Sequence, residues 1–303
     1  RASMALTDLF EIAARSRPTR KAVVDWRASL EYAGLAVEAN RLARALRARG
    51  LASGDRVVMQ VTNSVEAAIT TWAVLASGGV LVPLHAVQRG EALLPVLRDC
   101  TPRWAVLGAE QQGTLAQLAM ASPDLQGAFC WAGTRPSAAT VEDPRMERWA
   151  QDGGADACST AHSERTSQHE VPRDDSLAAI LYTSGSTGEP KGVMLTHGNM
   201  CAAVRAVNAY LRLDDGDVIY SPLPLSSSYG LYQLLLGLAI GATDGVGDRR
   251  EVLAHARPGR FGLRVGHRSA RRGRDPSPRT RHGDRFTART AAPTIRAGCL
   301  PGP

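Results

Sequence analysis

The sequence lacks the closely spaced cysteines that a disulfide framework or a zinc site would need. Its five cysteines are scattered along the chain, and none of them forms a CxxC pair. Small disulfide-built domains and structural zinc sites both depend on such pairs, so the spacing argues against both. An odd, dispersed set is typical of a reduced intracellular protein, and we therefore expect a cytoplasmic location.

The sequence also lacks a long uninterrupted apolar run. The uncharged stretch Ala67–Gln88 comes closest, but Gly78 and Pro83 interrupt it. Such breaks predict a buried helix followed by a buried strand rather than a membrane span. The N-terminal segment carries Asp8 and Glu11 where a signal peptide would be apolar. We expect neither a membrane span nor a secretory signal.

Lysine is nearly absent, with only Lys21 and Lys191 against 34 arginines. From Asp244 to Pro303 the chain has 14 arginines and five acidic residues, a formal charge of +9, which leaves −2 for the first 243 residues. Only nine of these last 60 residues are Val, Leu, Ile or Phe, which is too few for a packed core. We predict a folded part at residues 1–243 and a disordered, low-complexity Arg/Gly/Pro tail at 244–303.

The tail admits two interpretations. Its dominance by Arg, Gly, Pro, Ala and Thr is what an out-of-frame reading of GC-rich DNA would give, so our hypothesis is a frameshift product. Clustered arginine also favours sequence-blind nucleic-acid binding. However, the only aromatic residues of the tail are Phe261 and Phe286, and no zinc pattern is present. We therefore expect no dedicated nucleic-acid role.

The body alternates helical and strand patterns, which predicts an α/β fold with parallel sheets flanked by helices. Asn63 and Glu66 predict a capping box at the start of the second long helix, and residues 133–175 predict a long surface excursion. Helices are predicted at Leu6–Ala13, Tyr32–Leu46, Asn63–Ala76, Gly90–Cys100, Asn199–Leu211 and Gly230–Gly241, and strands at Asp55–Val61, Val80–Leu84, Arg103–Gly108, Ser176–Thr183, Gly192–Thr196 and Asp217–Leu225.

The segment YTSGSTGEPKG (Tyr182–Gly192) is rich in glycine and hydroxyl side chains and ends in a lysine. Glycines let successive backbone N–H groups point into one concavity, which suits an anion. A lysine adds a mobile positive charge, so a polyphosphate is the ligand that this pattern favours. The segment is not a Walker A loop, since Pro190 stands where the second glycine should be. A flexible surface turn is the alternative.

The longer stretch LAAILYTSGSTGEPKGVMLTHGN (Leu177–Asn199) resembles the phosphate-binding motif of the adenylate-forming (AMP-binding) superfamily. That superfamily includes acyl-CoA ligases, adenylation domains of peptide synthetases and luciferases. The segments Ser29–Leu46, Gly54–Ala86 and Ser221–Leu231 resemble other parts of it in the right order. The resemblance covers roughly Leu6 to Thr243 and implies the N-terminal portion of the large domain, an incomplete version of the fold.

The resemblance implies an ATP-dependent acid–thiol ligase. A carboxylic acid would react with ATP and Mg²⁺ to an acyl-adenylate and pyrophosphate, and coenzyme A or a carrier-protein thiol would then take the acyl group. It implies no protein-held metal and leaves the catalytic residues unknown. The residues that it implies for the β- and γ-phosphates of ATP are Thr183, Ser184, Gly185, Ser186, Thr187, Gly188 and Lys191.

The acid-pocket segment departs from the family pattern. Where many acyl-CoA ligases carry an aromatic–His pair, this chain has Ser226 and Ser227. Serine cannot stack on a substrate or change charge as imidazole can. The resemblance implies Ser227, Tyr229 and Gly230 as pocket residues, with a core position as the alternative for the tyrosine. We interpret His197 as a helix-start residue rather than a base.

The second half of the large domain and the small C-terminal domain of the family have no counterpart after Thr243. The sequence hypothesis is therefore a truncated, inactive copy of a ligase. The alternatives are a non-catalytic remnant and a weak nucleic-acid binder acting through the tail. The nature of the acid stays open.

Overall fold

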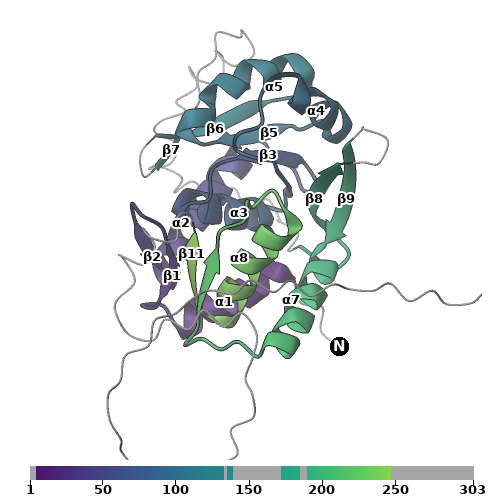
Figure 1. The fold of residues 1–303 in the computed structure, drawn as a ribbon. Coiled ribbons are helices and arrows are strands. Elements are labelled where there is room, and N and C mark those ends of the chain that lie inside the picture. The colour runs from purple at the N-terminus through teal and green to yellow at the C-terminus, as the bar shows by residue number, and fades with distance from the viewer. Residues whose placement is uncertain (1–4, 133–134, 139–171, 185–189, 247–303) are drawn as a thin grey trace, which may run out of the picture. The chain divides into compact units, whose positions relative to one another are not determined.

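The computed structural model describes residues 5–132, 135–138, 172–184 and 190–246 (Figure 1). Nearly all of the predicted tail and most of the predicted excursion lie outside these residues. The helices are α1 Leu6–Ser16, α2 Tyr32–Ala48, α3 Val65–Ser77, η1 Gly90–Leu93, α4 Leu94–Cys100, η2 Ala109–Thr114, α5 Leu115–Ala121, α7 His197–Leu211 and α8 Ser228–Ile240. The strands are β1 Lys21–Val24, β2 Ser29–Glu31, β3 Arg56–Gln60, β4 Val80–Pro83, β5 Trp104–Leu107, β6 Gly127–Ala132, β7 Arg135–Ala138, β8 Leu177–Ser184, β9 Pro190–Thr196, β10 Val218–Ser221 and β11 Thr243–Val246.

The strands form two sheets, which confirms the predicted α/β fold. The large sheet has seven strands in the order β7-β6-β5-β3-β4-β8-β9, and the small sheet has four in the order β10-β11-β1-β2. Within the large sheet, the strands from β6 to β8 are parallel, whereas β7 and β9 pair antiparallel at the two edges. In the small sheet β10, β11 and β1 are parallel and β2 pairs antiparallel with β1, so both sheets are mixed.

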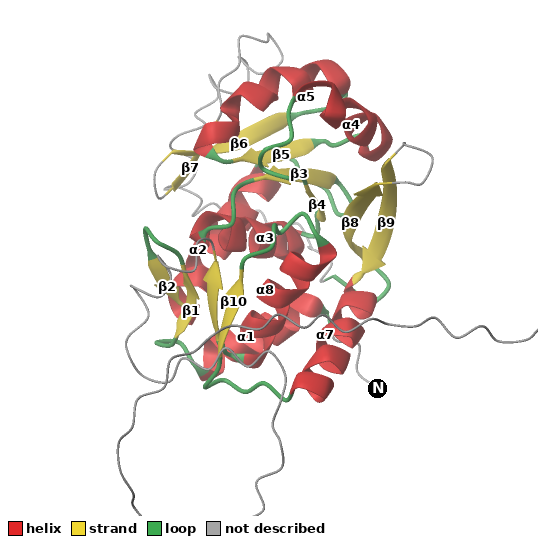
Figure 2. Ribbon diagram, in the orientation of Figure 1, coloured by secondary structure: helices red, strands yellow, loops and turns green. Residues whose placement is uncertain are grey.

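The central strands β3, β4 and β5 of the large sheet are buried on both faces, as their near-continuous apolar sequences predict. Along β3, Val57 and Met59 join the cluster that contains Trp72 of α3, and we call this side the inner face. Val58 joins the cluster that contains Leu97 of α4, on what we call the outer face. Figure 2 shows α4 and α5 on one side of the sheet and α2 and α3 on the other. Alternation along each strand thus separates two apolar layers.

The uncharged stretch Ala67–Gln88 supplies most of α3 and all of β4, as predicted. Trp72, at the centre of α3, is 1% exposed and stacks on Phe10 of α1, with ring centroids 4.6 Å apart. Gly78 ends the helix with a φ of +81°, a conformation that glycine adopts without strain. Among the described residues, no helix combines the length and apolar character that crossing a bilayer requires.

The predicted capping box of Asn63 and Glu66 is wrong. Ser64 is the N-cap of α3, and its side chain accepts a hydrogen bond from the Ala67 amide at 3.3 Å. The predicted strand Asp217–Leu225 is also shorter than expected, since β10 ends at Ser221. Proline follows at 222 and 224, and neither residue has an N–H to donate to a ladder.

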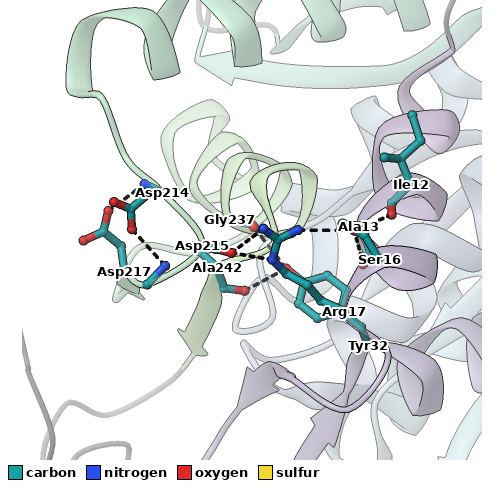
Figure 3. A network of polar contacts seen from close by, with 11 residues as sticks. Ile12, Ala13, Ser16, Arg17, Tyr32, Asp214, Asp215, Asp217, Gly237 and Ala242 are labelled. Atoms are coloured by element: carbon teal, nitrogen blue, oxygen red, sulfur yellow. Dashed lines mark hydrogen bonds and ion pairs between the residues drawn. The ribbon is translucent and has the colours of Figure 1, made fainter.

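Polar contacts join the N-terminal helices to the end of the described chain (Figure 3). The Tyr32 hydroxyl donates to the Ala242 carbonyl at 2.7 Å and lies 3.1 Å from the Gly237 carbonyl. At the end of α1, Arg17 forms an ion pair with Asp215, in the segment before β10. Sequence positions about two hundred residues apart are thereby fixed to each other.

Asp244 in β11 is fully buried without a hydrogen-bond partner for either carboxyl oxygen. The carboxyl group faces Gly237 of α8, where an added Cβ would lie 2.2 Å from Asp244 Oδ2. Burial raises the pKa of this carboxyl group well above its ordinary value. The folded chain therefore favours the protonated form, whereas the unfolded chain ionises at an ordinary acidic pH.

This difference in pKa between the folded and unfolded chain predicts that the free energy of unfolding decreases as the pH rises. The stability linked to the protonated Asp244 is fully present below the unfolded pKa of about 4 and is lost as the pH rises toward the folded pKa. Relative to Asp244→Asn, the unfolding free energy of the wild-type chain should fall by about 1.4 kcal/mol per pH unit over that window. Urea unfolding at several pH values measures this gap. Asp124→Asn, at an exposed carboxylate, supplies the baseline, and a gap that stays constant with pH would contradict the assignment.

Candidate functional site

The glycine-rich segment lies between two strands, as predicted, and these strands, β8 and β9, pair antiparallel. In the register of β8 and β9, Thr183 lies opposite Lys191 and Ser184 lies opposite Pro190. Of the predicted phosphate-binding residues, Thr183, Lys191 and the backbone of Ser184 are described. Gly185, Ser186, Thr187 and Gly188 lie outside the described residues.

The glycine-rich segment follows β8 at an edge of the large sheet where other strands also end. Because β8, β4, β3 and β5 are parallel neighbours, their carboxyl ends meet at one edge. Ligands of open α/β sheets bind in the space outside the carboxyl ends of the strands. A ligand of this sheet is therefore expected to bind at this edge.

Thr183 and Lys191 lie on the inner face of the sheet. Ile180 and Tyr182 pack with the outer cluster, whereas Leu181 packs with the inner one. Alternation along β8 then turns Thr183 to the inner face, and its cross-strand partner Lys191 shares that face. Both residues are exposed. A hydroxyl group and an ammonium group are thus presented together to solvent.

Asn63 anchors the predicted acid-pocket segment at the same edge. It follows β3 by three residues, and its amide Nδ2 donates to the carbonyls of Leu223, at 2.7 Å, and Ser221, at 3.4 Å. Its Oδ1 accepts from the Leu225 amide at 3.1 Å. One side chain thereby satisfies several backbone groups of a proline-rich turn. The sequence did not reveal this role, because Asn63 and Ser64 are equally good N-cap residues and the contacts of Asn63 are with residues about 160 positions away.

The predicted pocket residues have separate roles in this turn. Ser227 is the N-cap of α8, where its hydroxyl accepts from the Gly230 amide at 3.1 Å and donates to the Pro224 carbonyl at 2.8 Å. Gly230 is buried, and an added Cβ would lie 2.3 Å from the Pro224 oxygen, so only glycine fits. Tyr229 is 68% exposed. The core position considered for this tyrosine is therefore wrong, and the phenol is open to solvent.

His197 is buried at the start of α7, which supports the interpretation as a helix-start residue. Burial lowers the pKa of its imidazole to about 4, although the charges of Asp8 and Asp174 act in the opposite direction. Thr196, the residue before it, is the N-cap of α7, and its hydroxyl accepts a hydrogen bond from the Asn199 amide at 3.1 Å. Within the described ranges, no cluster of three or more His, Cys, Asp or Glu side chains could hold a metal ion.

Comparison with known proteins identifies relatives of the whole described fold. A family model described as AMP-binding enzyme matches residues 10–259. The medium-chain fatty-acid–CoA ligase of Escherichia coli is 32% identical over 244 residues. The phosphinothricin tripeptide synthetase PhsC of Streptomyces viridochromogenes is 31% identical over 238 residues. The crystal structure of ATP-bound MatB from Rhodopseudomonas palustris is 28% identical to the chain, with a TM-score of 0.63.

The chain spans only part of the length of these relatives. The alignments cover 78% of this chain and 41% of the E. coli ligase, and 78% of this chain and 19% of the synthetase. The structural alignment covers 80% of this chain and 45% of MatB. The match therefore lies in one region of larger proteins. The family model reaches residue 259, beyond Thr243, the end of the resemblance seen in the sequence.

The Asn63 contacts predict a local effect of mutation. Asn63→Ala should lower the free energy of unfolding by about 1 kcal/mol, because partly buried backbone groups lose their hydrogen-bond partners. Amide hydrogen exchange at Leu225, whose N–H donates to Asn63, should accelerate. Asn208→Ala is the matched control, since Asn208 accepts from the Leu213 amide at the far end of α7. Unchanged protection at Leu225 in the Asn63 variant would show that the side chain does not hold this turn.

Proposed function

The chain belongs to the AMP-binding enzyme family, and on that premise we propose that it binds the triphosphate of ATP for an acid–thiol ligase reaction. In this reaction a carboxylate attacks the α-phosphate of ATP, which gives an acyl-adenylate and releases pyrophosphate. A thiol, from coenzyme A or a carrier protein, then displaces AMP and takes the acyl group. Catalysis of this kind relies on positioning and on neutralising phosphate charge.

The cross-strand pair of Thr183 and Lys191 is the observation that carries the proposal. Both side chains are exposed on one face, at the carboxyl edge of a parallel sheet, on either side of the glycine-rich segment. An ammonium there can follow the β- and γ-phosphates as their charge changes. We propose that the backbone and hydroxyl groups of Ser184, Gly185, Ser186, Thr187 and Gly188 complete the phosphate contacts.

We propose only the chemical class of the other two reactants, a carboxylic acid and a thiol. The relatives include a fatty-acid–CoA ligase and a peptide synthetase, so both kinds of thiol suit the family. Mg²⁺ commonly binds through substrate phosphates and only one or two carboxylates. We propose that it arrives with ATP.

Titration calorimetry, which measures the affinity of the whole chain for MgATP, tests the proposal. Lys191→Met should raise the dissociation constant by about tenfold or more, since the phosphates lose a cationic partner. Lys21→Met is the charge-matched control, because Lys21 lies on β1 in the small sheet and is the other lysine of the chain. Equal affinity in the two variants, or no binding by the wild-type chain, would refute the phosphate site.

Exchange of labelled pyrophosphate into ATP tests the adenylation step. The assay is run with fatty, aromatic and amino acids in turn. Acid-dependent exchange should disappear in Lys191→Met and persist in Lys21→Met. Exchange that continues in the Lys191 variant would show that the reaction does not use this segment.

A further inference from the structure

A hydrogen bond connects the β8–β9 hairpin, near the end where its two strands are joined, to helix α4. Tyr182, on β8, donates its hydroxyl to the carboxylate of Asp99, the second-to-last residue of α4. The two residues are 83 positions apart in the sequence. Tyr182 directly precedes Thr183, so this contact lies one residue away from the proposed phosphate-binding pair.

Gly192 leaves the space that the tyrosine ring needs. It lies opposite Tyr182 in the hairpin register. An added Cβ at Gly192 would lie 3.1 Å from Tyr182 Cζ, 3.2 Å from its hydroxyl oxygen and 2.8 Å from Ile180 Cγ2. The phenol ring therefore lies against the backbone of β9, and a side chain at position 192 would displace it from Asp99.

The contact supports a part of the hairpin that has little other lateral support. The register of β8 with β4 is Leu81 opposite Ala179, whereas the pairing of β8 with β9 continues to Ser184 opposite Pro190. Beyond Ala179, in the described part of the chain, β8 has a registered strand partner only on the β9 side. β9 is itself an edge strand of the sheet. Figure 2 shows α4 beside this end of the hairpin.

The tyrosine remains a hydrogen-bond donor at ordinary pH. Burial and the hydrogen bond to Asp99 raise the pKa of its phenol, and the neighbouring Cys100 and Asp99 charges act in the same direction. Tyr182 also packs against the outer apolar cluster. Its side chain thus joins the hairpin to α4 by an apolar contact and by a hydrogen bond to a charged acceptor, which is stronger than a neutral one.

We propose that Tyr182 is a positioning residue, which through Asp99 holds the hairpin against α4 so that Thr183 and Lys191 meet the nucleotide phosphates in a fixed direction. This inference rests on the proposed ATP-binding function. Tyr182 faces outward and Thr183 faces inward, so Tyr182 does not touch the nucleotide itself. It acts by reducing the motion that the phosphate-binding pair would have to give up on binding.

Affinities of the whole chain for MgATP, tripolyphosphate and AMP test the inference. Tyr182→Phe should lower the affinity for MgATP and for tripolyphosphate by about tenfold. The affinity for AMP should stay the same, because AMP has no β- or γ-phosphate. Asp99→Ala should have the same effect. Asp99→Asn, whose amide oxygen still accepts the phenol proton, should restore most of the affinity. Tyr210→Phe, at a tyrosine 86% exposed on α7, is the matched control.

The double variant separates positioning from general destabilisation. Because Tyr182 and Asp99 act as one unit, Tyr182→Phe with Asp99→Ala should bind MgATP no more weakly than either single variant. The positioning role would be overturned if Tyr182→Phe lowered the affinities for AMP and MgATP equally, or if it left the MgATP affinity normal. Absence of nucleotide binding in the wild-type chain would instead refute the function on which the inference rests.

Discussion

Burial of the large sheet on both faces is the constraint on which the rest of the structure depends. Val57 and Val58 are neighbours in β3, yet they belong to different apolar layers. Because each face needs its own cover, α3 and α4 must lie on opposite sides of the sheet. The parallel strands supply that cover themselves, because parallel neighbours need crossover connections and the helices in those connections pack on the faces of the sheet. Parallel order brings the carboxyl ends of β3, β4 and β8 to one edge, and there the hairpin and the Asn63 turn can be held together.

Much of this arrangement could be predicted from local sequence. The apolar strands β3, β4 and β5 are short, continuous and bounded by turn residues, so their identity follows from composition alone. Thr196 and Asn199 form the predicted helix start, since a cap is a contact between near neighbours. The pattern from Leu177 to Asn199 also indicated the family. Physical contacts within a few residues decide these features, and the sequence displays them directly.

Other features depend on distant residues, and local patterns could not reveal them. β1 has only four residues, and its partner β11 lies at the other end of the described chain. Asn63 resembles a cap until the carbonyls of residues 221 and 223 are known to lie beside it. Tyr229 has an aromatic ring typical of a core, but the tight turn around Gly230 directs it outward. β6 and α5 were missed as well, because short apolar segments resemble one another without their packing partners.

The position of β1 has a consequence for biosynthesis. In the finished sheet β1 lies between β2 and β11, and the hydroxyl of Thr243 donates to the carbonyl of Lys21, 222 residues earlier. During translation β1 and its neighbour β2 therefore leave the ribosome long before β11, the neighbour on the other side, exists. Until then the apolar residues Ala22, Val23 and Val24 of β1 are not fully buried, and one edge of the strand has no partner. The nascent chain is therefore prone to aggregate at this strand, and chaperones would have to protect it.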